Sequence, residues 1–560
     1  MHTDFPSLPL VDLVLRGGRI TTFADPAQAP AEVSAIALAH GVVVACGTDA
    51  QLEPYAAQAS RVIELRGRRV LPGLNDSHIH AVRAAASWAE SMHWEDARTL
   101  EDCLRLVREQ AARVGAGNWV AVIGGWHSSQ LAEGRAPTRA ELDEAAPENP
   151  VYVQELYDRG VLSTAALRAC GLDDDSPDPV RGTLLRDAAG RLTGEVRGIG
   201  AFALPTSLAL EHTDADAGLR KMTAAFLRHG LTGVVDGGGL MMTPRDYDPV
   251  HRAWRRGELG IRMRLFHSAW TRGAEVDDIT ALTGVAQPDS GDGMLRLSGV
   301  GEIPHLGCHD MEGLDPFELG DQAHAELVEI VRLCARRGWR MSIHAVREAT
   351  LSRILDAWEQ VEAEQGGIAG RGWSIVHADE ASRSQLERIA ALGAGILVQN
   401  RMLLKGGDYA DAWGIDATAQ APPIGDMRGL GIPIGAGTDA TRANWFSPWA
   451  SVQWLVTGRA LGVRGHRDAR HLMARAEALA AYTRDAAWFT GEQDHRGRLA
   501  PGYDADLCVP DLDPLECDED ELSTIRSDLT VVAGRVVFDS GALGAAAPGS
   551  PIRTRERQGA

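Results

Sequence analysis

Eight short apolar segments, most of them separated by helical patterns, constrain the fold of this chain more than any other feature. An apolar run of this length, bounded by glycine or polar residues, is typical of a strand whose two faces are both covered, as in a parallel sheet. Amphipathic stretches at 217–230, 324–338 and 384–394 lie between several of the runs. Eight such strands alternating with helices predict an α/β fold, a (β/α)8 TIM-like barrel. The runs are 69–80, 232–239, 261–269, 295–303, 339–346, 373–379, 393–400 and 432–440.

The two ends of the chain carry a different pattern, with short strand-like runs and tight turns. The stretches SAIALAHGVVVACG near the start and LTVVAGRVVFDSG near the end each predict a hairpin. We therefore expect one small composite β-sandwich domain from residues 1–70 and 496–545, with the barrel between them at 71–495. Residues 546–560 are rich in Ala, Gly, Pro and charge, which predicts a disordered tail.

The segment between the first and second predicted strands is too long for a single β/α crossover. It contains two further strand-like runs, GNWVAVIGGWH and NPVYVQELYD. We therefore predict an inserted subdomain at about 90–210. Because it follows the carboxyl end of a barrel strand, it should form a cap or wall over the face where barrel active sites lie.

Charge and cysteine usage limit the partners and the compartment. A net charge of −21 over 560 residues argues against nucleic acid and anionic membranes as partners. The seven cysteines are scattered singly, which fits a reducing compartment. The N-terminus lacks a secretory pattern, and the chain has no apolar stretch of the roughly 20 residues that a membrane span needs. These features predict a cytoplasmic protein.

Several predicted strands end in a side chain that can bind a metal ion. Alternate residues on a strand point the same way, so His78 and His80 should project together. One strand-end histidine alone is usually structural, and Asp439 alone could cap a helix. Four histidines and two carboxylates at one rim instead favour a site for Zn²⁺ or another borderline divalent metal. The predicted ligands are His78, His80, Glu302, His344, His377 and Asp439.

A second group of residues provides weaker candidates for substrate contacts. Trp126 and His127 follow a glycine turn in the insertion, and a packed tryptophan with a surface histidine is the alternative. His305 and His309 follow the fourth strand, where a plain loop role is the alternative. Trp445 follows Asp439 and could form an aromatic wall or pack in the core.

Four motifs give the chain a family resemblance that covers nearly its whole length. They are LPGLNDSHIH, GGWHSSQLAEGRAPTRAELDEAAPENPVYV, GIPIGAGTDA and AYTRDAAWFTGEQDHRGRLAPGYDADLCVPD. With these motifs the chain resembles the metal-dependent amidohydrolase superfamily, and within it the branch that includes N-substituted formamide deformylase. The resemblance implies a barrel with one or two divalent metal ions, and a homodimer is one possible assembly.

The resemblance also implies individual roles. His78 and His80 would bind the more buried metal with Asp439, while His344 and His377 would bind a second metal or shape a single-metal site. Many relatives bridge two metals with a carboxylated lysine on the fourth strand, but LSGVGEIPHLGCHD contains no lysine. Glu302 would replace that bridge, or it would be structural beside one metal. Relatives often have a histidine after the Asn-Pro-Val strand; Tyr157 or Asp158 would take its place in this chain, and Tyr157 is a further candidate for a substrate contact.

The expected reaction is hydrolysis of a C–N bond other than a peptide bond. Asp439 would accept the proton of the attacking water, and His377 or His344 would stabilise the developing oxyanion. An amide, formamide, carbamate or cyclic amide is the expected substrate class. One alternative is a single-metal deaminase of a ring amidine, with Glu348 as general acid. The other is a non-catalytic relative that serves as a binding or assembly module.

Overall fold

The computed structural model describes residues 11–24, 31–462 and 467–544, so the tail predicted at 546–560 lies outside the described residues. A parallel eight-stranded sheet forms the central body, and each strand pairs in parallel with the next one along the chain. All eight predicted runs contribute a strand, which confirms the barrel fold. The strands are β8 (Leu74–Ile79), β15 (Leu231–Asp236), β16 (Arg262–His267), β18 (Leu295–Val300), β19 (Arg340–Ala345), β20 (Ser374–His377), β21 (Gly395–Gln399) and β22 (Ile434–Gly437).

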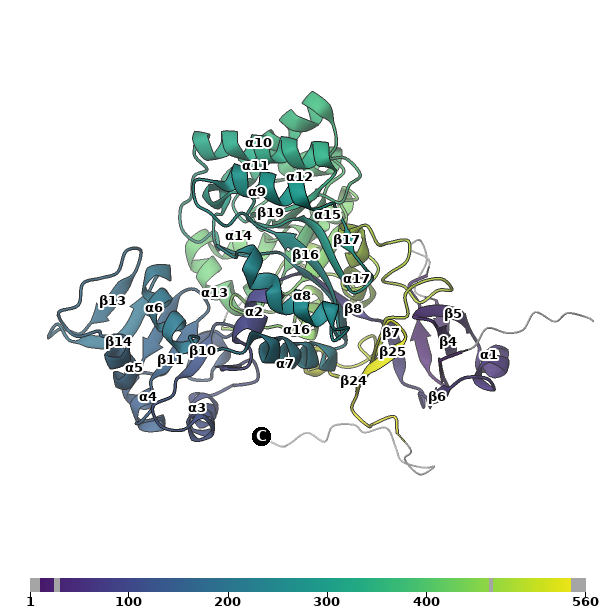
Figure 1. Cartoon of the computed structure of the whole chain (residues 1–560), viewed down its shortest axis with the longest axis horizontal. Coiled ribbons are helices and arrows are strands. Elements are labelled where there is room, and N and C mark those ends of the chain that lie inside the picture. Colours follow the sequence, from purple (N-terminus) through teal and green to yellow (C-terminus); the bar gives the residue numbers. More distant parts are fainter. Residues whose placement is uncertain (1–10, 25–30, 463–466, 545–560) are drawn as a thin grey trace, which may run out of the picture.

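Helices follow the strands and pack outside the sheet (Figure 1). A short strand, β17 (Ser290–Gly291), adds to β18 in the antiparallel direction. The helices of the barrel region are α2 (Ala81–Ser87), α7 (Ala215–Arg228), α8 (Asp248–Arg255), α9 (Glu275–Val285), α10 (Asp321–Arg337), α11 (Glu348–Gln365), α12 (Arg383–Ala391), α13 (Met402–Trp413), α14 (Ile415–Gln420), α15 (Ile424–Gly429), α16 (Pro448–Thr457) and α17 (Arg475–Ala481).

Helix α10 illustrates how the sequence sets these elements. Its buried residues Leu327, Ile330, Val331 and Cys334 recur every three or four positions, so they form one apolar stripe against the sheet. The helix ends at Gly338, whose φ of 74° is a left-handed conformation that suits glycine. Strand β19 begins two residues later and runs to the barrel rim.

The barrel closes where β22 meets β8. The amide of Asp439 donates to His78 O at 2.9 Å, and the amide of His80 donates to Ala440 O at 2.9 Å. A Cβ atom on Gly437 would lie only 2.6 Å from His78 N, so the close approach of the two strands requires glycine there. The closure therefore falls at the residues predicted to bind metal.

The two ends of the chain share one sheet beside the barrel. Its order is β25-β24-β23-β7-β2-β3, and a second sheet of order β5-β4-β1-β6 packs against it through buried side chains such as Leu13, Ile36, Val70 and Leu529. The strands are β1 (Leu13–Arg16), β2 (Arg19–Thr21), β3 (Glu32–Val33), β4 (Ala35–Ala39), β5 (Val42–Gly47), β6 (Arg61–Glu64), β7 (Arg69–Pro72), β23 (Leu507–Pro510), β24 (Ser527–Val532) and β25 (Arg535–Asp539), with helix α1 at Asp49–Ala56.

An inserted subdomain lies on the opposite side of the barrel from this sandwich (Figure 1). Its sheet has the order β13-β14-β12-β11-β10-β9 and its own apolar core, which includes Trp94, Trp126 and Leu142. The elements are β9 (Ser91–Met92), α3 (Leu100–Val114), β10 (Val120–Ile123), α4 (Arg139–Ala145), β11 (Val151–Glu155), β12 (Arg159–Leu162), α5 (Thr164–Ala169), β13 (Thr183–Arg186), β14 (Leu192–Arg197) and α6 (Ile199–Ala209).

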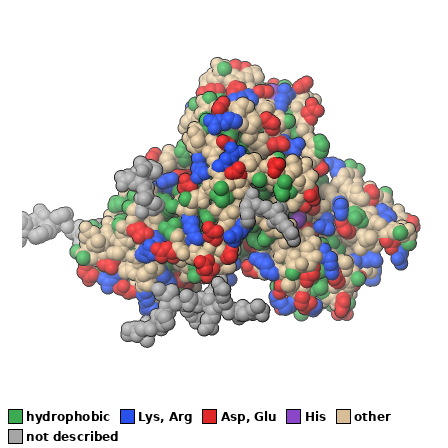
Figure 2. Space-filling view, turned by 180° about the vertical axis from the view of Figure 1, so that it is seen from behind, with side chains coloured by type: hydrophobic (Ala, Val, Ile, Leu, Met, Phe, Trp, Pro, Cys, Tyr) green, Lys and Arg blue, Asp and Glu red, His purple; other side chains and the backbone are tan. Residues whose placement is uncertain are grey.

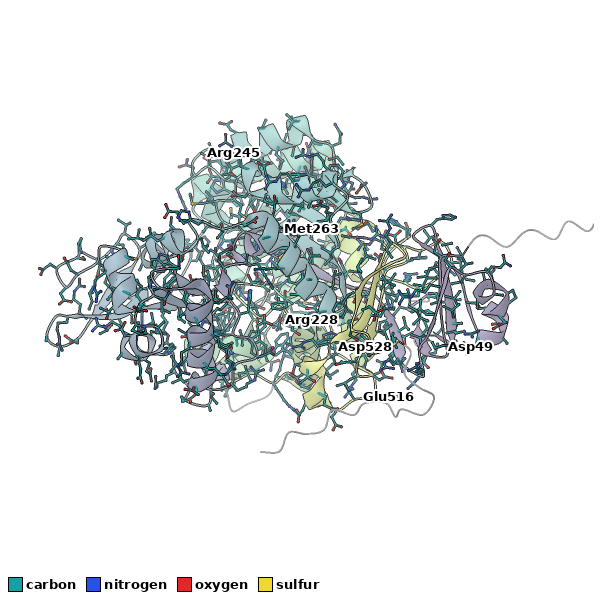
Figure 3. The ribbon with its side chains drawn as sticks, turned by 60° about the horizontal axis from the view of Figure 1, so that its bottom comes forward. Asp49, Arg228, Arg245, Met263, Glu516 and Asp528 are labelled. Atoms are coloured by element: carbon teal, nitrogen blue, oxygen red, sulfur yellow. The ribbon has the colours of Figure 1, made fainter. Side chains whose placement is uncertain are left out.

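The outer surface carries acidic and basic side chains interspersed over the face in Figure 2. Figure 3 shows Met263 of β16 near the middle of the molecule and Asp49 far out on the sandwich. All seven cysteines are free thiols. Among the described helices, none combines the length and the apolar character needed to cross a bilayer.

A buried ion cluster ties the C-terminal part of the chain to the barrel. Glu492 is fully buried and accepts from Arg264 of β16 at 2.7 and 2.9 Å and from Arg496 at 2.8 Å. Burial alone would raise the pKa of Glu492, but the positive charge of Arg496 and hydrogen bonds from His495 and Arg264 hold that pKa well below its usual value. The carboxylate is therefore ionised in the folded protein at any pH near neutrality.

We predict that Glu492→Gln destabilises the protein by about 3–5 kcal/mol, because it leaves the buried Arg264 without its counter-ion and removes the nearest carboxylate from Arg496. The pKa of Glu492 is lower folded than unfolded, so its contribution is complete above the unfolded value of about 4.3 and is lost as pH falls. Calorimetric melting should show the largest Tm difference from wild type near pH 7 and a smaller one below about pH 4. Glu329→Gln, on the exposed side of α10, is the control; an equal Tm loss in both variants would contradict the prediction.

Candidate metal centre

The six residues predicted to bind metal come together at the carboxyl ends of five barrel strands. Each is buried, with at most 5% of its surface exposed. Parallel strands end at the same rim, so strand-end residues far apart in the sequence become neighbours. They are His78 at the end of β8 and His80 just after it, Glu302 after β18, His344 in β19, His377 at the end of β20 and Asp439 after β22.

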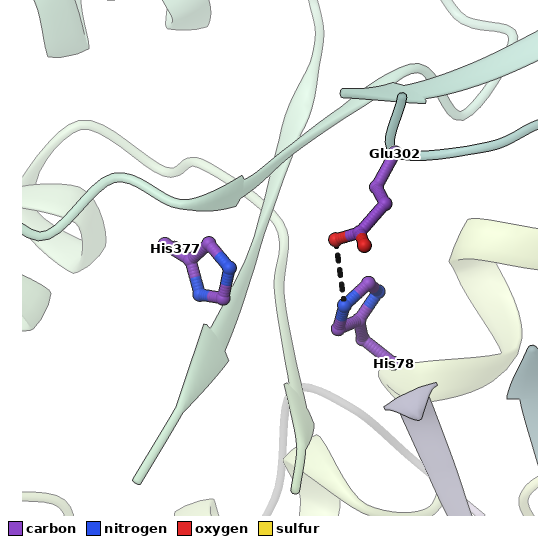
Figure 4. A group of neighbouring side chains, drawn as sticks. All are labelled: His78, Glu302 and His377. Atoms are coloured by element: carbon purple, nitrogen blue, oxygen red, sulfur yellow. Dashed lines mark ion pairs between the residues drawn. The ribbon is translucent and has the colours of Figure 1, made fainter. Parts of the chain in front are cut away.

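The carboxylate of Glu302 lies at the centre of this group. Its Oε2 is 3.3 Å from His78 Nε2 and 3.6 Å from His344 Nδ1, and its Oε1 is 3.3 Å from His80 Nε2. Figure 4 shows Glu302 pointing at His78, with His377 beside them. Glu302 therefore contacts histidines from two different strands with both of its oxygens.

Asp439 faces the same histidines from the other side of the closure. Its Oδ1 is 3.2 Å from His80 Nε2 and 3.7 Å from His78 Nε2. Asp439 and His377 have φ values of 58° and 78°, a left-handed conformation that is unusual for residues with a Cβ atom. Such local strain is typical of functional sites, where the surrounding structure holds a side chain in a required direction.

Neighbouring groups fix the direction of two of the imidazoles. His80 Nδ1 lies 2.6 Å from Gly238 O and donates to it, which directs Nε2 toward Glu302 and Asp439. His344 Nε2 lies 2.9 Å from Asp310 Oδ1, and Asp310 is itself held by the amides of Val346 and Arg347. A carboxylate behind a histidine is the usual way to orient a metal ligand.

The site concentrates opposite charges in a buried space. Burial would raise the pKa values of Glu302 and Asp439, but the histidines around them hold both well below the usual range. Burial would lower the pKa of His78, but the carboxylates of Asp439 and Glu302 beside its Nε2 raise it to about 10. The two carboxylates are thus anionic and create a strong attraction for positive charge at their midpoint.

These donors fit a divalent cation. Among the described residues, the buried atoms His78 Nε2 and His377 Nδ1 have no hydrogen-bond partner, and both histidines offer a donor atom within 4.8 Å of the Glu302 carboxylate. Donors bound at about 2.0–2.1 Å around one tetrahedral ion lie roughly 3.3 Å from each other. The shortest distances from His78 and His80 to the carboxylate oxygens of Glu302 and Asp439 are 3.2 and 3.3 Å. Imidazole and carboxylate together suit a borderline metal such as zinc.

A cavity of about 390 Å³ opens onto this centre. Its size is typical of a site for a small molecule. The insertion provides one wall with Gln154, Tyr157 and residues of α6, so it does cover the carboxyl rim. The barrel side of the lining is formed by His80, Arg83, Leu240, Glu302, Ile303, His309, Met311, Glu312, His344, His377, Arg401, Asp439, Arg442 and Ala443.

Of the weaker substrate-contact candidates, the structure brings Tyr157 and His309 to the cavity lining. The other four lie elsewhere. Trp126 is fully buried in the core of the insertion, and its Nε1 donates to Gln154 O. Trp445 is also buried, and its Nε1 donates to Gln130 Oε1. His127 lies near Glu155 and Asp408, and His305 pairs with Glu326 at 2.7 Å. Glu348, the general acid of the deaminase alternative, is exposed at the start of α11.

Several residues around the site were not predicted. Asp310 behind His344 follows His309 directly, so a carboxylate next to a candidate residue was an available signal. Asp76 lies two residues before His78, which places it on the same face of β8. Its Oδ2 accepts from Thr438 Oγ1 at 2.6 Å and so clamps the barrel closure. For Arg83 and Arg442, which lie on the cavity wall, no motif in the neighbouring sequence indicates a role at the site.

A (β/α)8 barrel with such a rim defines the class of metal-dependent hydrolases. The chain belongs to the amidohydrolase family, whose model matches residues 61–538. It is 24% identical to N-substituted formamide deformylase of Arthrobacter pascens over 90% of this chain and 95% of that protein. Among solved structures, an uncharacterized metal-dependent hydrolase of Pyrococcus horikoshii covers 91% of this chain and 99% of its own, with a TM-score of 0.65 and 20% identity. The structure of atrazine chlorohydrolase of Arthrobacter aurescens in complex with zinc covers 94% of this chain and 95% of its own, with a TM-score of 0.52 and 18% identity.

The family assignment confirms the resemblance and the expectation of an enzyme. It sets aside the alternative of a non-catalytic assembly module.

We predict that Thr438→Val destabilises the protein by about 1–3 kcal/mol, because the buried carboxylate of Asp76 loses its hydroxyl donor while the side-chain shape is kept. Thermal unfolding of the metal-loaded protein measures the loss. Thr280→Val, exposed on α9, is the matched control. A Tm equal to that of wild type would show that the hydroxyl does not stabilise the closure.

Proposed function

We propose that this protein hydrolyses a non-peptide C–N bond in a small molecule, with N-substituted formamides as the first substrate class to test. The convergence of four histidines and two carboxylates in a buried cavity carries this proposal. The similarity to a formamide deformylase over nearly the full length of both chains supports the substrate class. Formate and an amine would be the products.

The residues at the rim would hold the metal in two adjoining groups. His78, His80 and Asp439 offer donor atoms that all lie within 4.8 Å of one another, and Glu302 does so with His78 and His377. Because Glu302 reaches histidines of both β8 and β19, its carboxylate would serve as a ligand to both groups of donors, the role that the family resemblance gives to a carboxylated lysine. The histidine-rich donor set, and the zinc in the related atrazine chlorohydrolase, favour Zn²⁺.

A divalent cation in this position supplies Lewis acidity, which makes water more acidic and a substrate carbonyl more electrophilic. The chain itself must move the proton. Asp439 is ionised and lines the cavity, so its carboxylate accepts a proton from the attacking water as the oxygen adds to the carbonyl carbon. The same carboxyl group then gives that proton to the leaving nitrogen as the C–N bond breaks.

His377 is suited to stabilise the negative charge that develops on the carbonyl oxygen. Burial and the nearby Arg401 hold the pKa of His377 well below its usual value, so the imidazole is neutral. It lines the cavity at the end of β20, where its own backbone is left-handed. The N–H group of a neutral imidazole that is held in place can donate a hydrogen bond to an oxyanion. His344, oriented by Asp310, completes this side of the site.

The deaminase alternative receives no support from the structure's geometry. It requires a general acid after the fifth strand, and Glu348 is exposed at the N-terminal end of α11 rather than on the cavity wall. Product analysis separates the two reactions, because a deaminase releases ammonia whereas the proposed reaction releases an acid and an amine.

We predict that Asp439→Asn reduces kcat by about 100- to 10,000-fold, because the amide cannot accept the proton of the attacking water. Formate release from a panel of N-alkyl and N-aryl formamides measures the rate, and elemental analysis of the same samples measures the metal. Asp411→Asn, exposed on α13, is the control. Full activity in Asp439→Asn would overturn its role as the base.

We predict that wild-type protein binds two metal ions per chain and that Glu302→Ala binds one or none. The reason is that Glu302 contacts His78 and His80 of the first strand end and also His344 of β19. Elemental analysis after reconstitution with Zn²⁺ gives the stoichiometry, with Glu329→Ala as the control. One metal ion in both wild type and Glu302→Ala would place Glu302 outside the metal site.

A further inference from the structure

The charges on the cavity wall do not all have partners. Glu302 and Asp439 belong to the metal centre. Glu312 forms an ion pair with Lys405, and Arg401 forms one with Asp379 at 3.2 Å. Two cationic side chains remain on the lining, Arg83 and Arg442.

Neither of these two arginines has a counter-ion among the described residues. No carboxylate there lies within 4 Å of either guanidinium, and neither guanidinium donates a hydrogen bond within that part of the chain. Asp236, which interacts with Arg83 over a longer distance, uses its two oxygens to accept from the amides of Val82 and Gly238. Arg83 and Arg442 are both partly buried, and both line the cavity.

The two arginines also act on each other. The pKa of Arg442 is lowered to about 10, mainly by burial and in second place by the positive charge of Arg83. Two guanidinium groups that repel each other beside an apolar wall raise the free energy of the cavity, and an anion between them would lower it. Guanidinium groups bind carboxylates through paired hydrogen bonds, which makes arginine the usual residue for such recognition.

The wall formed by α6 has the opposite character. Ile199, Phe202 and Ala203 present apolar surface to the cavity, and Leu240 and Met311 add to it from the barrel loops. A ligand complementary to this cavity, which adjoins the metal centre, therefore combines an apolar side group with one anionic group.

We propose that the substrate is an N-formyl or similarly N-acylated amino acid, whose carboxylate is bound by Arg83 and Arg442 and whose apolar side chain packs on α6. This inference rests on the proposed hydrolysis of formamides. A formyl group has no side group of its own, so the carboxylate must be on the amine side of the bond that breaks. Water adds to the formyl carbon, the C–N bond breaks, and formate and the free amino acid result.

The test compares N-formylphenylalanine with N-formylphenylalaninamide, which has nearly the same shape without the charge. Formate release by the zinc-loaded enzyme gives kcat/KM for each. We expect wild type to prefer the acid and the acid-to-amide ratio of kcat/KM to fall about 10- to 100-fold in Arg442→Gln and in Arg83→Gln, the loss expected for a charged hydrogen bond. Arg220→Gln removes the same charge from the exposed side of α7 and should keep the wild-type ratio.

A wild-type preference for the amide, or an unchanged ratio in both cavity variants, would overturn the inference. If neither compound releases formate, the proposed reaction fails on these substrates, and the anion site is then tested by binding measurements alone. Calorimetry with 3-phenylpropanoate and 3-phenylpropanamide then measures anion recognition without turnover. A Kd for the acid that rises at least about 10-fold in Arg442→Gln and Arg83→Gln, but not in Arg220→Gln, supports the anion site. Equal Kd values in all four proteins refute it.

Discussion

The closure between the first and last barrel strands is the constraint on which the site depends. Gly437 allows β22 to approach β8, and the amide of Asp439 then donates to His78 O at 2.9 Å. Asp76 adds a buried clamp through the hydroxyl of Thr438. Because the hydrogen bonds of the closure come from the residues that face the metal centre, a shift between these two strands would move His78 and Asp439 apart. The fold and the site are therefore stabilised by the same contacts.

The insertion is fixed to the rim by a second set of charges. Lys405 on α13 is almost completely buried and forms ion pairs with Asp158 of the insertion, at 2.8 Å, and with Glu312 of a barrel loop. One buried cation thus joins the insertion to two parts of the barrel. This contact fixes the residue next to Tyr157, so the part of the insertion that carries Tyr157 has a defined position at the cavity.

The sequence predicted the strands and the residues at their ends, which depend on a short-range pattern. It did not predict which other side chains line the cavity, because their positions depend on the whole fold. The strand runs predicted the barrel, and strand ends must meet at one rim, so His344 and His377 could be named without any knowledge of loops. Trp126 was different: the glycine turn beside it suggested a pocket, but the insertion has a core of its own that takes up the indole. The pairing of Arg83 with Arg442 could not be predicted either, since nothing in the sequence shows that the two positions face one cavity.

That pairing nevertheless follows from the closure. Arg83 lies three residues after His80, and Arg442 lies three residues after Asp439, so each arginine is on the short segment that leaves a strand at the closure. The hydrogen bonds that fix His80 and Asp439 relative to each other must therefore also limit the distance between the two guanidinium groups and the metal centre. An anion bound by both arginines would be held at a set distance from the reacting bond, which is how binding energy far from that bond contributes to orientation. The closure thus determines where a substrate is bound as well as where it reacts.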